Sequence, residues 1–260
     1  MKYAHFLFGL LAGTALGSAV VASTGSPLVG MGGDKDAIKQ IVRETIAEEP
    51  KLILETLQKF NETQRKEQMA SAGEVLKDSA VREQVFNPAE APSVGPKDST
   101  RVVVEFFDYN CPACKFMFKG LDELIQKDKT ARVIFREYPI FGPQSETNAK
   151  FGLAVNRLYP EKYLDFHRKM MMHEGRVDEA GALAIIKELG MDEAKVKTES
   201  VKPDITDLLA ENAKLGKALQ IQGTPTLAVG DKIIPHAVSF EELEAALAGD
   251  AKPEEAKQPQ

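Results

Sequence analysis

The chain of 260 residues is long enough for one large domain or for a domain with an accessory module. Hydrophobic residues make up 43% of it and charged residues 28%, values that exclude a wholly disordered protein. The formal net charge of −6 argues against a nucleic-acid-binding protein, because such proteins usually carry a basic surface. Only two cysteines occur, Cys111 and Cys114, too few for a disulfide framework or a four-thiolate zinc site.

Residues 1–22 are typical of a secretory signal peptide. Lys2 precedes an apolar run that ends in small residues at Ala22, and residues 23–33 then form a linker rich in glycine and serine. The alternative is an uncleaved membrane anchor, but the run is only about as long as the shortest membrane-spanning helices, and its Gly and Ala residues weaken insertion. We therefore expect a mature chain that starts at Ser23 outside the cytoplasm, where disulfides can form.

Residues 34–86 have the apolar spacing of helices and form a predicted helical extension. Pro50 separates two helical runs and suits the first turn of the second. The first apolar stripe consists of Ile38, Ile41, Val42, Ile46, Ile53, Leu57 and Phe60. After the polar residues 61–68, a second stripe consists of Met69, Ala72 and Leu76. The stripes must be buried against the chain itself or against another chain. We favour self-association into a dimer or trimer through a segment whose removal should leave a folded monomer.

Residues 87–99 contain three prolines and a glycine, a composition typical of a linker between modules. The β-branched and aromatic run that follows, Thr100–Phe107, predicts a buried strand. A helix is expected from about Cys111 to Lys127, and Ala131–Tyr138 predicts a second strand. A strand, a helix and a strand joined in this way form a parallel βαβ unit.

The rest of the chain predicts a helical insertion followed by a smaller ββα unit. Residues 145–219 are helical, with breaks near Pro160, Gly175, Gly190 and Pro203. The strands Thr226–Val229 and Lys232–Ile234 flank a Gly-Asp hairpin turn, and Ser239 with Glu242 has the spacing of a capping box for a helix through Leu247. Residues 100–248 are therefore expected to form an α/β domain, and the polar tail 249–260 to be disordered.

The two cysteines lie where the first predicted strand turns into its helix. Pro112 suits the first helical position, so Cys111 falls at the N-cap, where free backbone N–H groups and the positive helix end favour a thiolate. A lowered pKa makes Cys111 the attacking thiol at neutral pH, whereas Cys114, one turn further on, is placed to resolve a mixed disulfide. The spacing predicts a two-electron dithiol/disulfide switch.

A structural disulfide and half of a metal site are the alternatives for this pair. A bridge that closes so small a loop removes little chain entropy, and two thiolates alone suit Cu(I) best among metals. Met117 and the run Met170–His173 offer further soft ligands, but consecutive methionines in a helix more often fill core gaps in several directions. We favour the redox switch and expect no metal site and no cofactor, with copper capture as the rival function.

The segments FFDYNCPAC and YPIFGPQS, together with Gly223-Thr224-Pro225-Thr226, resemble the thioredoxin superfamily, specifically its DsbA-like secreted branch. The resemblance covers about residues 101–247. It implies a thioredoxin-like fold with an inserted helical domain, a periplasmic location, a membrane redox partner, and secreted protein substrates that are unfolded or carry wrong disulfides. It also implies that Thr224-Pro225 is a cis peptide that holds the substrate chain beside Cys111. Glu105 matches the family's buried acid, which is placed to take a proton from Cys114.

The chain departs from strongly oxidising DsbA-like members, which carry a histidine between the cysteines where this chain has Ala113. Without that cation the thiolate loses a stabilising partner, so the pair should be less oxidising. Thr224 in place of a valine resembles isomerase and reductase members, and the helices around Pro50 resemble the extension of suppressor of copper sensitivity C proteins. We expect a disulfide isomerase or reductase, with a disulfide-donating oxidase as the alternative within the enzyme class. No catalytic motif includes His167, His173 or His236, which are expected to be exposed or hydrogen-bonded.

Overall fold

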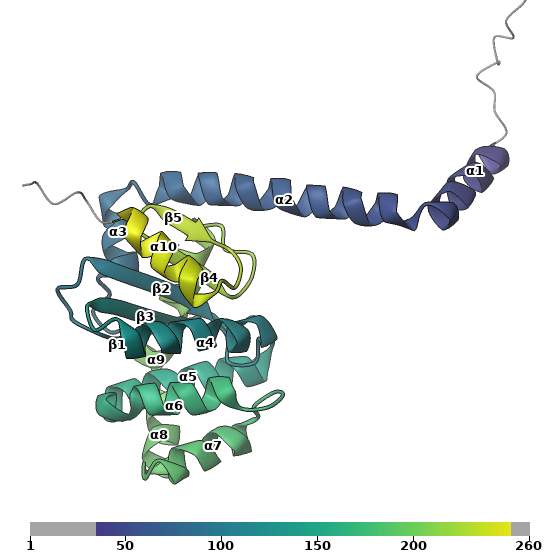
Figure 1. Ribbon diagram of the computed structural model, residues 1–260. Coiled ribbons are helices and arrows are strands. Elements are labelled where there is room, and N and C mark those ends of the chain that lie inside the picture. The colour runs from purple at the N-terminus through teal and green to yellow at the C-terminus, as the bar shows by residue number, and fades with distance from the viewer. Residues whose placement is uncertain (1–34, 251–260) are drawn as a thin grey trace, which may run out of the picture. The chain divides into compact units, whose positions relative to one another are not determined.

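The computed structural model describes residues 35–250 (Figure 1). The expected signal peptide, the linker 23–33 and residues 251–260 of the expected tail lie outside these residues. Gly249 and Asp250, which were expected to belong to the disordered tail, instead end the last helix. The chain divides into two compact units after Glu55. Within residues 35–250, no helix is both long enough and apolar enough to cross a membrane.

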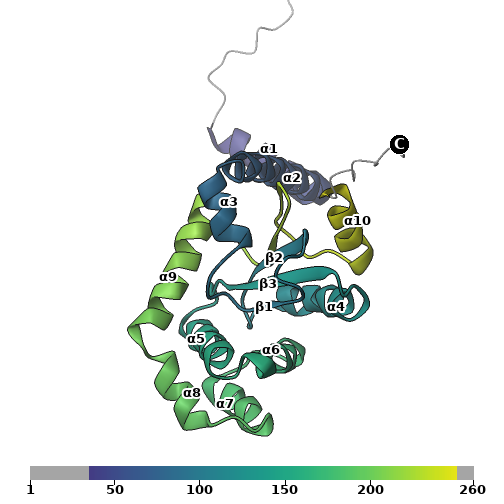
Figure 2. The ribbon, with the colours of Figure 1, turned by 90° about the vertical axis from the view of Figure 1, so that its left-hand side faces the viewer.

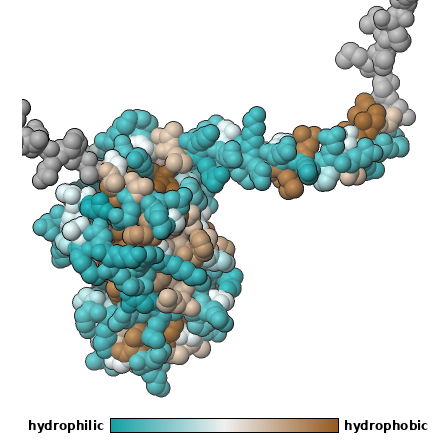
Figure 3. All heavy atoms as spheres, viewed as in Figure 1, coloured by the Kyte–Doolittle hydropathy of each residue, from teal (hydrophilic) through white to brown (hydrophobic). Residues whose placement is uncertain are grey.

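The first unit contains α1 (Lys35–Glu48) and the first turns of α2 (Pro50–Val75). As predicted, Pro50 opens the second helix, where its missing N–H leaves no hydrogen bond unmade. No residue of α1 is buried. The apolar side chains of the predicted first stripe are exposed, with Ile41 61% exposed and Ile46 49% exposed. Figure 3 shows apolar side chains at the surface of this helical segment.

The second unit is built on a five-stranded mixed sheet in the order β1-β3-β2-β4-β5. The central strands β2 and β3 are parallel, with Val103 opposite Val133, whereas the other neighbouring strands are antiparallel. The strand bounds are Ser93–Val94 for β1, Arg101–Phe107 for β2, Ala131–Glu137 for β3, Thr226–Val229 for β4 and Lys232–Ile234 for β5. The predicted βαβ unit and the predicted hairpin are therefore confirmed, and they form one sheet.

The helices of this unit end close to the predicted breaks. Their bounds are Ser79–Phe86 for α3, Pro112–Lys127 for α4, Pro143–Leu158 for α5, Pro160–Lys162 for the short 3-10 helix η1, Tyr163–Met172 for α6, Glu179–Glu188 for α7, Glu193–Ser200 for α8, Pro203–Ala218 for α9 and Phe240–Asp250 for α10. The capping box is confirmed, since Ser239 N–H donates to the Glu242 carboxylate at 2.8 Å and Glu242 N–H donates to the Ser239 hydroxyl at 3.3 Å.

Helices cover both faces of the sheet (Figure 2). Alternate residues of each strand point to opposite faces, so Val103 and Phe107 join one core while Val104 and Phe106 join the other. The first core includes side chains of α4, α10 and the helices α5–α8, and the second includes side chains of α3, α9 and the end of α2. The fold is the expected thioredoxin-like α/β fold with inserted helices, although α9 also covers a face of the sheet.

Two features of this unit differ from the sequence-based prediction. The Pro-rich stretch 87–99 contains the edge strand β1, which pairs with β3 and is too short to show any periodicity. The end of the helical extension is also part of the core, because Leu76 and Val85 are fully buried against the sheet. The expectation that residues 34–86 are dispensable for folding is therefore wrong, since their removal would uncover one face of the sheet.

The two apolar stripes of the extension have different surroundings. In the second stripe, Ala72 and Leu76 are fully buried, and the neighbouring Ser71 accepts a hydrogen bond from the Gln220 amide at 2.6 Å. At the end of the first stripe, Leu57 is 52% exposed and Phe60 58% exposed. Within the second unit, the described residues therefore cover the second stripe but leave Leu57 and Phe60 exposed.

Candidate active site

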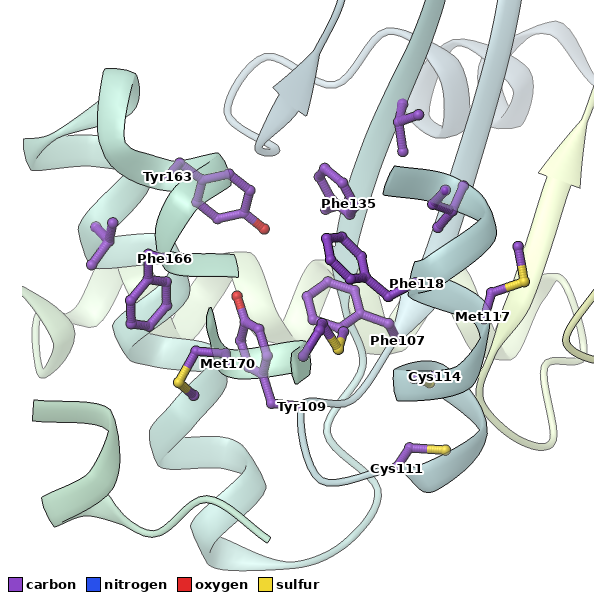
Figure 4. Packing of buried hydrophobic residues seen from close by; sticks show 14 of the residues in the cluster. Phe107, Tyr109, Cys111, Cys114, Met117, Phe118, Phe135, Tyr163, Phe166 and Met170 are labelled. Carbon is purple, nitrogen blue, oxygen red and sulfur yellow. The ribbon is translucent and has the colours of Figure 1, made fainter. Parts of the chain in front are cut away.

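The cysteine pair occupies the turn from β2 into α4, as the sequence predicts. Cys111 is the N-cap of α4 and has extended backbone angles of φ −84° and ψ 118°, while Pro112 takes the first helical position. Cys114 lies one turn further along the same helix (Figure 4). Both thiols are free and buried, with Cys111 3% exposed and Cys114 fully buried. A pair at this spacing in the reduced state can exchange with a disulfide.

The segment before β4 lies against the first cysteine. The Cys111 thiol donates a hydrogen bond to the carbonyl oxygen of Thr224 at 3.2 Å. The Thr224-Pro225 peptide bond is cis, as the family resemblance implied. Pro225 is buried. The fold thus brings together Cys111, Thr224 and Pro225 from its two halves.

The two thiols have opposite electrostatic environments. Hydrogen bonds from the Cys114 thiol, from the Thr224 side chain and from the backbone N–H groups of Cys114 and Ala113 lower the pKa of Cys111 to about 6, although partial burial acts against them. Burial, followed by the hydrogen bond to Cys111 and the charge of Glu105, raises the pKa of Cys114 well above its usual range. The site therefore holds one thiolate and one protonated thiol at neutral pH.

Glu105 lies on β2, interacts electrostatically with both thiols and is fully buried, so the expectation of burial is confirmed. Its carboxyl oxygens have no hydrogen-bond partner among the described residues. Burial, and secondarily the charge of Cys111, raises the pKa of Glu105 to about 8. A carboxyl group with such a pKa can hold or release a proton near neutral pH, which is what exchange at a buried thiol requires.

Asp108, which the sequence analysis did not single out, organises the loop that carries Cys111. Its carboxylate accepts hydrogen bonds from the N–H groups of Asn110 at 2.8 Å, Ile140 at 2.8 Å and Phe141 at 3.0 Å. Its carbonyl oxygen accepts the N–H of Cys111 at 3.0 Å. The signal in the sequence is a pair of polar residues, Asp108 and Asn110, in the short segment between β2 and the motif.

The histidines and methionines lie as the sequence analysis expected. His167 is fully buried, and its Nδ1 is hydrogen-bonded to the hydroxyls of Tyr109 at 3.2 Å and Tyr163 at 3.3 Å, while His173 and His236 are exposed. Burial, helped by the charge of Arg168, lowers the pKa of His167 to about 3, so its imidazole is neutral. The methionines face several directions: Met117, Met170 and Met171 are buried in the core, whereas Met172 is exposed.

Met117, one of the soft ligands considered in the sequence analysis, accepts a hydrogen bond within the core. The sulfur of Met117 accepts the N–H of Val238 at 3.2 Å and is fully buried. Among residues 35–250, no group of three or more histidine, cysteine and acidic side chains is arranged to hold a metal ion.

A reduced dithiol at the N-terminus of a helix, on a sheet of this topology, defines a thiol–disulfide oxidoreductase of the thioredoxin and DsbA type. The family model described as Thioredoxin matches residues 87–248, and the chain belongs to this family.

The chain is similar in sequence and structure to several known proteins of this class. Disulfide bond formation protein D of Bacillus subtilis is 26% identical over 171 residues, which are 62% of this chain and 77% of that protein. The crystal structure of a thioredoxin-like oxidoreductase from Silicibacter pomeroyi is 33% identical with a TM-score of 0.61, covering 65% of this chain and 96% of that one. Proteus mirabilis ScsC in a transitional conformation is 27% identical with a TM-score of 0.61, covering 83% of this chain and 96% of that one.

Proposed function

We propose that the protein is a periplasmic protein disulfide isomerase or reductase in which Cys111 attacks substrate disulfides and Cys114 resolves the resulting mixed disulfide. The observation that carries the proposal is the placement of the two thiols: Cys111 is the N-cap of α4 beside the Thr224 carbonyl, and Cys114 is fully buried one turn further on. The periplasmic location is supported by the signal-like residues 1–22 and by a chemistry that needs a compartment where disulfides persist.

In the first step, the Cys111 thiolate attacks one sulfur of a substrate disulfide. A bond forms between the two sulfurs, the substrate's S–S bond breaks, and the second substrate sulfur leaves as a thiolate that takes a proton from water. The backbone of Thr224-Pro225, beside Cys111, is placed to position the substrate chain. The exposed side chains of Ile140 and Phe141, whose N–H groups bind Asp108, lie on the adjoining loop and offer apolar contacts to an unfolded chain.

In the second step, the mixed disulfide has two fates. In reduction, the ionised form of Glu105 takes the proton of Cys114, whose sulfur then attacks the sulfur of Cys111. The Cys111–Cys114 disulfide forms as the mixed disulfide bond breaks, and the substrate sulfur leaves as a thiolate that takes a proton from water. In isomerisation, another substrate thiolate attacks the mixed disulfide instead, which forms a new substrate disulfide and returns Cys111 as a thiolate. The high pKa of Cys114 favours the second fate, because a protonated thiol resolves slowly and leaves time for a substrate thiol to attack.

We also propose that the N-terminal helices associate between chains, an arrangement that would suit an isomerase. The first apolar stripe, from Ile38 to Phe60, is exposed in the described chain, and pairing it with the same stripe of other copies would remove it from water. Apolar burial contributes about 25 cal/mol per Å², before the cost of association. An oligomer would hold several redox pairs around one misfolded substrate and would shield their thiols from an oxidising membrane partner. The similarity to ScsC extends into these helices, since it covers more of the chain than follows residue 87.

The test combines a redox equilibrium with an activity assay on a substrate with scrambled disulfides. We expect a reduction potential lower than that of a strongly oxidising DsbA-type enzyme, together with recovery of native disulfides in the scrambled substrate. Rapid donation of disulfides to a reduced substrate without reshuffling would indicate an oxidase instead. Stoichiometric tight binding of Cu(I) by the reduced protein, with no activity on the scrambled substrate, would indicate a copper-binding protein.

A further inference from the structure

The residues on both sides of the cysteine motif bind the same segment of the helical insertion. This segment, His173–Val177, lies between α6 and α7 and is here called the connector. Before the motif, the side-chain amide of Asn110 accepts the N–H of Val177 at 2.7 Å and donates to the carbonyl oxygen of Val177 at 3.2 Å. After the motif, the Lys115 ammonium donates to the carbonyl oxygen of His173 at 2.6 Å. The connector therefore contacts Asn110 and Lys115, the residues on either side of the redox motif.

The contact made by Asn110 is buried and geometrically specific. Asn110 is 4% exposed and Val177 is fully buried, so water does not compete for either group. Two antiparallel hydrogen bonds between one carboxamide and one backbone residue fix both the position of the amide and the rotation of its plane. Loss of the amide would leave the buried N–H of Val177 without a partner, which is unfavourable. Asn110 is thus held firmly by a residue far away in the sequence.

This anchoring acts directly next to Cys111. The backbone N–H of Asn110 is held by the Asp108 carboxylate, while its side chain is held by Val177. Because the backbone N–H and the side chain of Asn110 are both held, Cys111 has little freedom to move from the N-cap of α4. The N–H groups of Ala113 and Cys114 stabilise a thiolate only while Cys111 stays in that position.

We propose that Asn110 is a positioning residue that, through its paired hydrogen bonds with Val177, holds Cys111 at the N-cap of α4 and beside the Thr224 carbonyl. The inference rests on the proposed function, in which Cys111 is the attacking thiol. It predicts that the connector, which belongs to the helical insertion, tunes the redox pair without touching either sulfur. Loosening Asn110 should weaken the thiolate and thereby disfavour the reduced form relative to the disulfide.

Asn110→Ala and a matched control, Asn148→Ala, test this proposal in the full-length chain. The Asn148 amide is also fully buried and donates to the same carbonyl oxygen of Val177 at 2.9 Å, but Asn148 lies on α5 and is not adjacent to a cysteine. The measurements are the pKa of Cys111, from the pH dependence of its alkylation rate, and the equilibrium constant with glutathione. Asn110→Ala should raise the pKa by about half a unit or more and shift the equilibrium about threefold or more toward the disulfide. Asn148→Ala should change neither, although both variants should lower the melting temperature.

The proposal is overturned if Asn110→Ala leaves the pKa and the equilibrium unchanged, or if Asn148→Ala shifts them equally. Should Asn110→Ala fail to fold, Asn110→Ser, which places a smaller polar side chain at the buried position, must show the same direction of change. An ordinary thiol pKa in the unaltered protein would contradict the proposed function itself. A low pKa of Cys111 in the unaltered protein that stays the same in the Asn110 variants would contradict only the positioning role.

Discussion

The Cys111 thiol and the carbonyl oxygen of Thr224 are 3.2 Å apart, although 113 residues separate the two positions in the chain. The neutral thiol donates to this carbonyl, and ionisation of the thiol removes that bond. The carbonyl oxygen is then free to accept another donor, such as an N–H group of an extended substrate chain. The same ionisation that activates the sulfur therefore frees a backbone acceptor beside it.

The first prediction concerns the reactivity of the two thiols. Cys111 should be alkylated with a midpoint near pH 6, because its thiolate is stabilised at the helix end, while Cys114 stays protected. Cys111→Ser should abolish turnover, and Cys114→Ser should accumulate mixed disulfides with substrates. Mass spectrometry of alkylated peptides across a pH series measures both. Equal alkylation of the two thiols with an ordinary pKa would contradict the assignment of the attacking residue.

The second prediction concerns Glu105→Gln in the reduced protein. Folding raises the pKa of Glu105 from 4.5 to about 8, so its contribution to stability is fully present below about pH 4.5 and is lost as the pH rises toward 8. The Glu105→Gln variant has no carboxyl group to ionise and does not lose this stability. Its free energy of unfolding should therefore be higher than that of the unaltered protein by on the order of 2–4 kcal/mol at pH 8, and nearly equal to it at pH 4.5. Denaturant unfolding at the two pH values measures the difference.

Glu137→Gln is the matched control for Glu105→Gln. Glu137 is also fully buried, on the neighbouring strand β3, and burial raises its pKa well above the usual range. Its substitution should raise stability at high pH in the same way. Only Glu105→Gln should slow the attack of Cys114 on the mixed disulfide, as followed by the release of a labelled substrate thiol. Similar release rates in both variants would remove Glu105 from the proton-transfer role.

The sequence predicts those parts of the fold and site whose signals are local. A proline at the first helical position places Cys111 at the N-cap, and Gly230-Asp231 marks the hairpin between β4 and β5. The edge strand β1 is not predictable in this way, because two residues have no periodicity and their pairing depends on β3. The role of Asn110 is hidden for the same reason, since its partner Val177 lies 67 residues away. Contacts across such separations depend on the tertiary fold.

The third prediction concerns the residue between the cysteines. Ala113 is exposed, so Ala113→His should be accommodated without strain in the core. A protonated imidazole beside the Cys111 thiolate favours the reduced form, which should raise the reduction potential by up to about 30 mV near pH 6. The gain should shrink at pH 8, where the histidine is neutral, and Ala113→Gln should give little change at either pH. An unchanged potential in Ala113→His would show that this position does not tune the pair.

The fourth prediction concerns the first apolar stripe and the oligomeric state. Since Leu57 is 52% exposed and Phe60 58% exposed, substituting both by Asp should not disturb the core of the second unit. If these side chains pair between chains, Leu57→Asp with Phe60→Asp should convert a dimer or trimer into a folded monomer, because a carboxylate in an apolar interface is unfavourable. Light scattering at micromolar concentration measures the mass, and circular dichroism checks the fold. Lys59→Asp, which adds a carboxylate on the same helix but outside the stripe, is the control and should remain oligomeric.

The same variants separate assembly from chemistry. Deleting residues 34–60 should also give a monomer that folds, because the deletion leaves Ala72 and Leu76 in the core and starts the shortened helix at Asn61, a favourable N-cap residue. Both monomers should still reduce small disulfides, since the cysteine site is intact, but should lose most of their activity on a scrambled protein substrate. Full-length mature protein that is monomeric by light scattering would show that the stripe has no partner chain. Monomeric variants that retain full activity on the scrambled substrate would show that isomerisation does not need assembly.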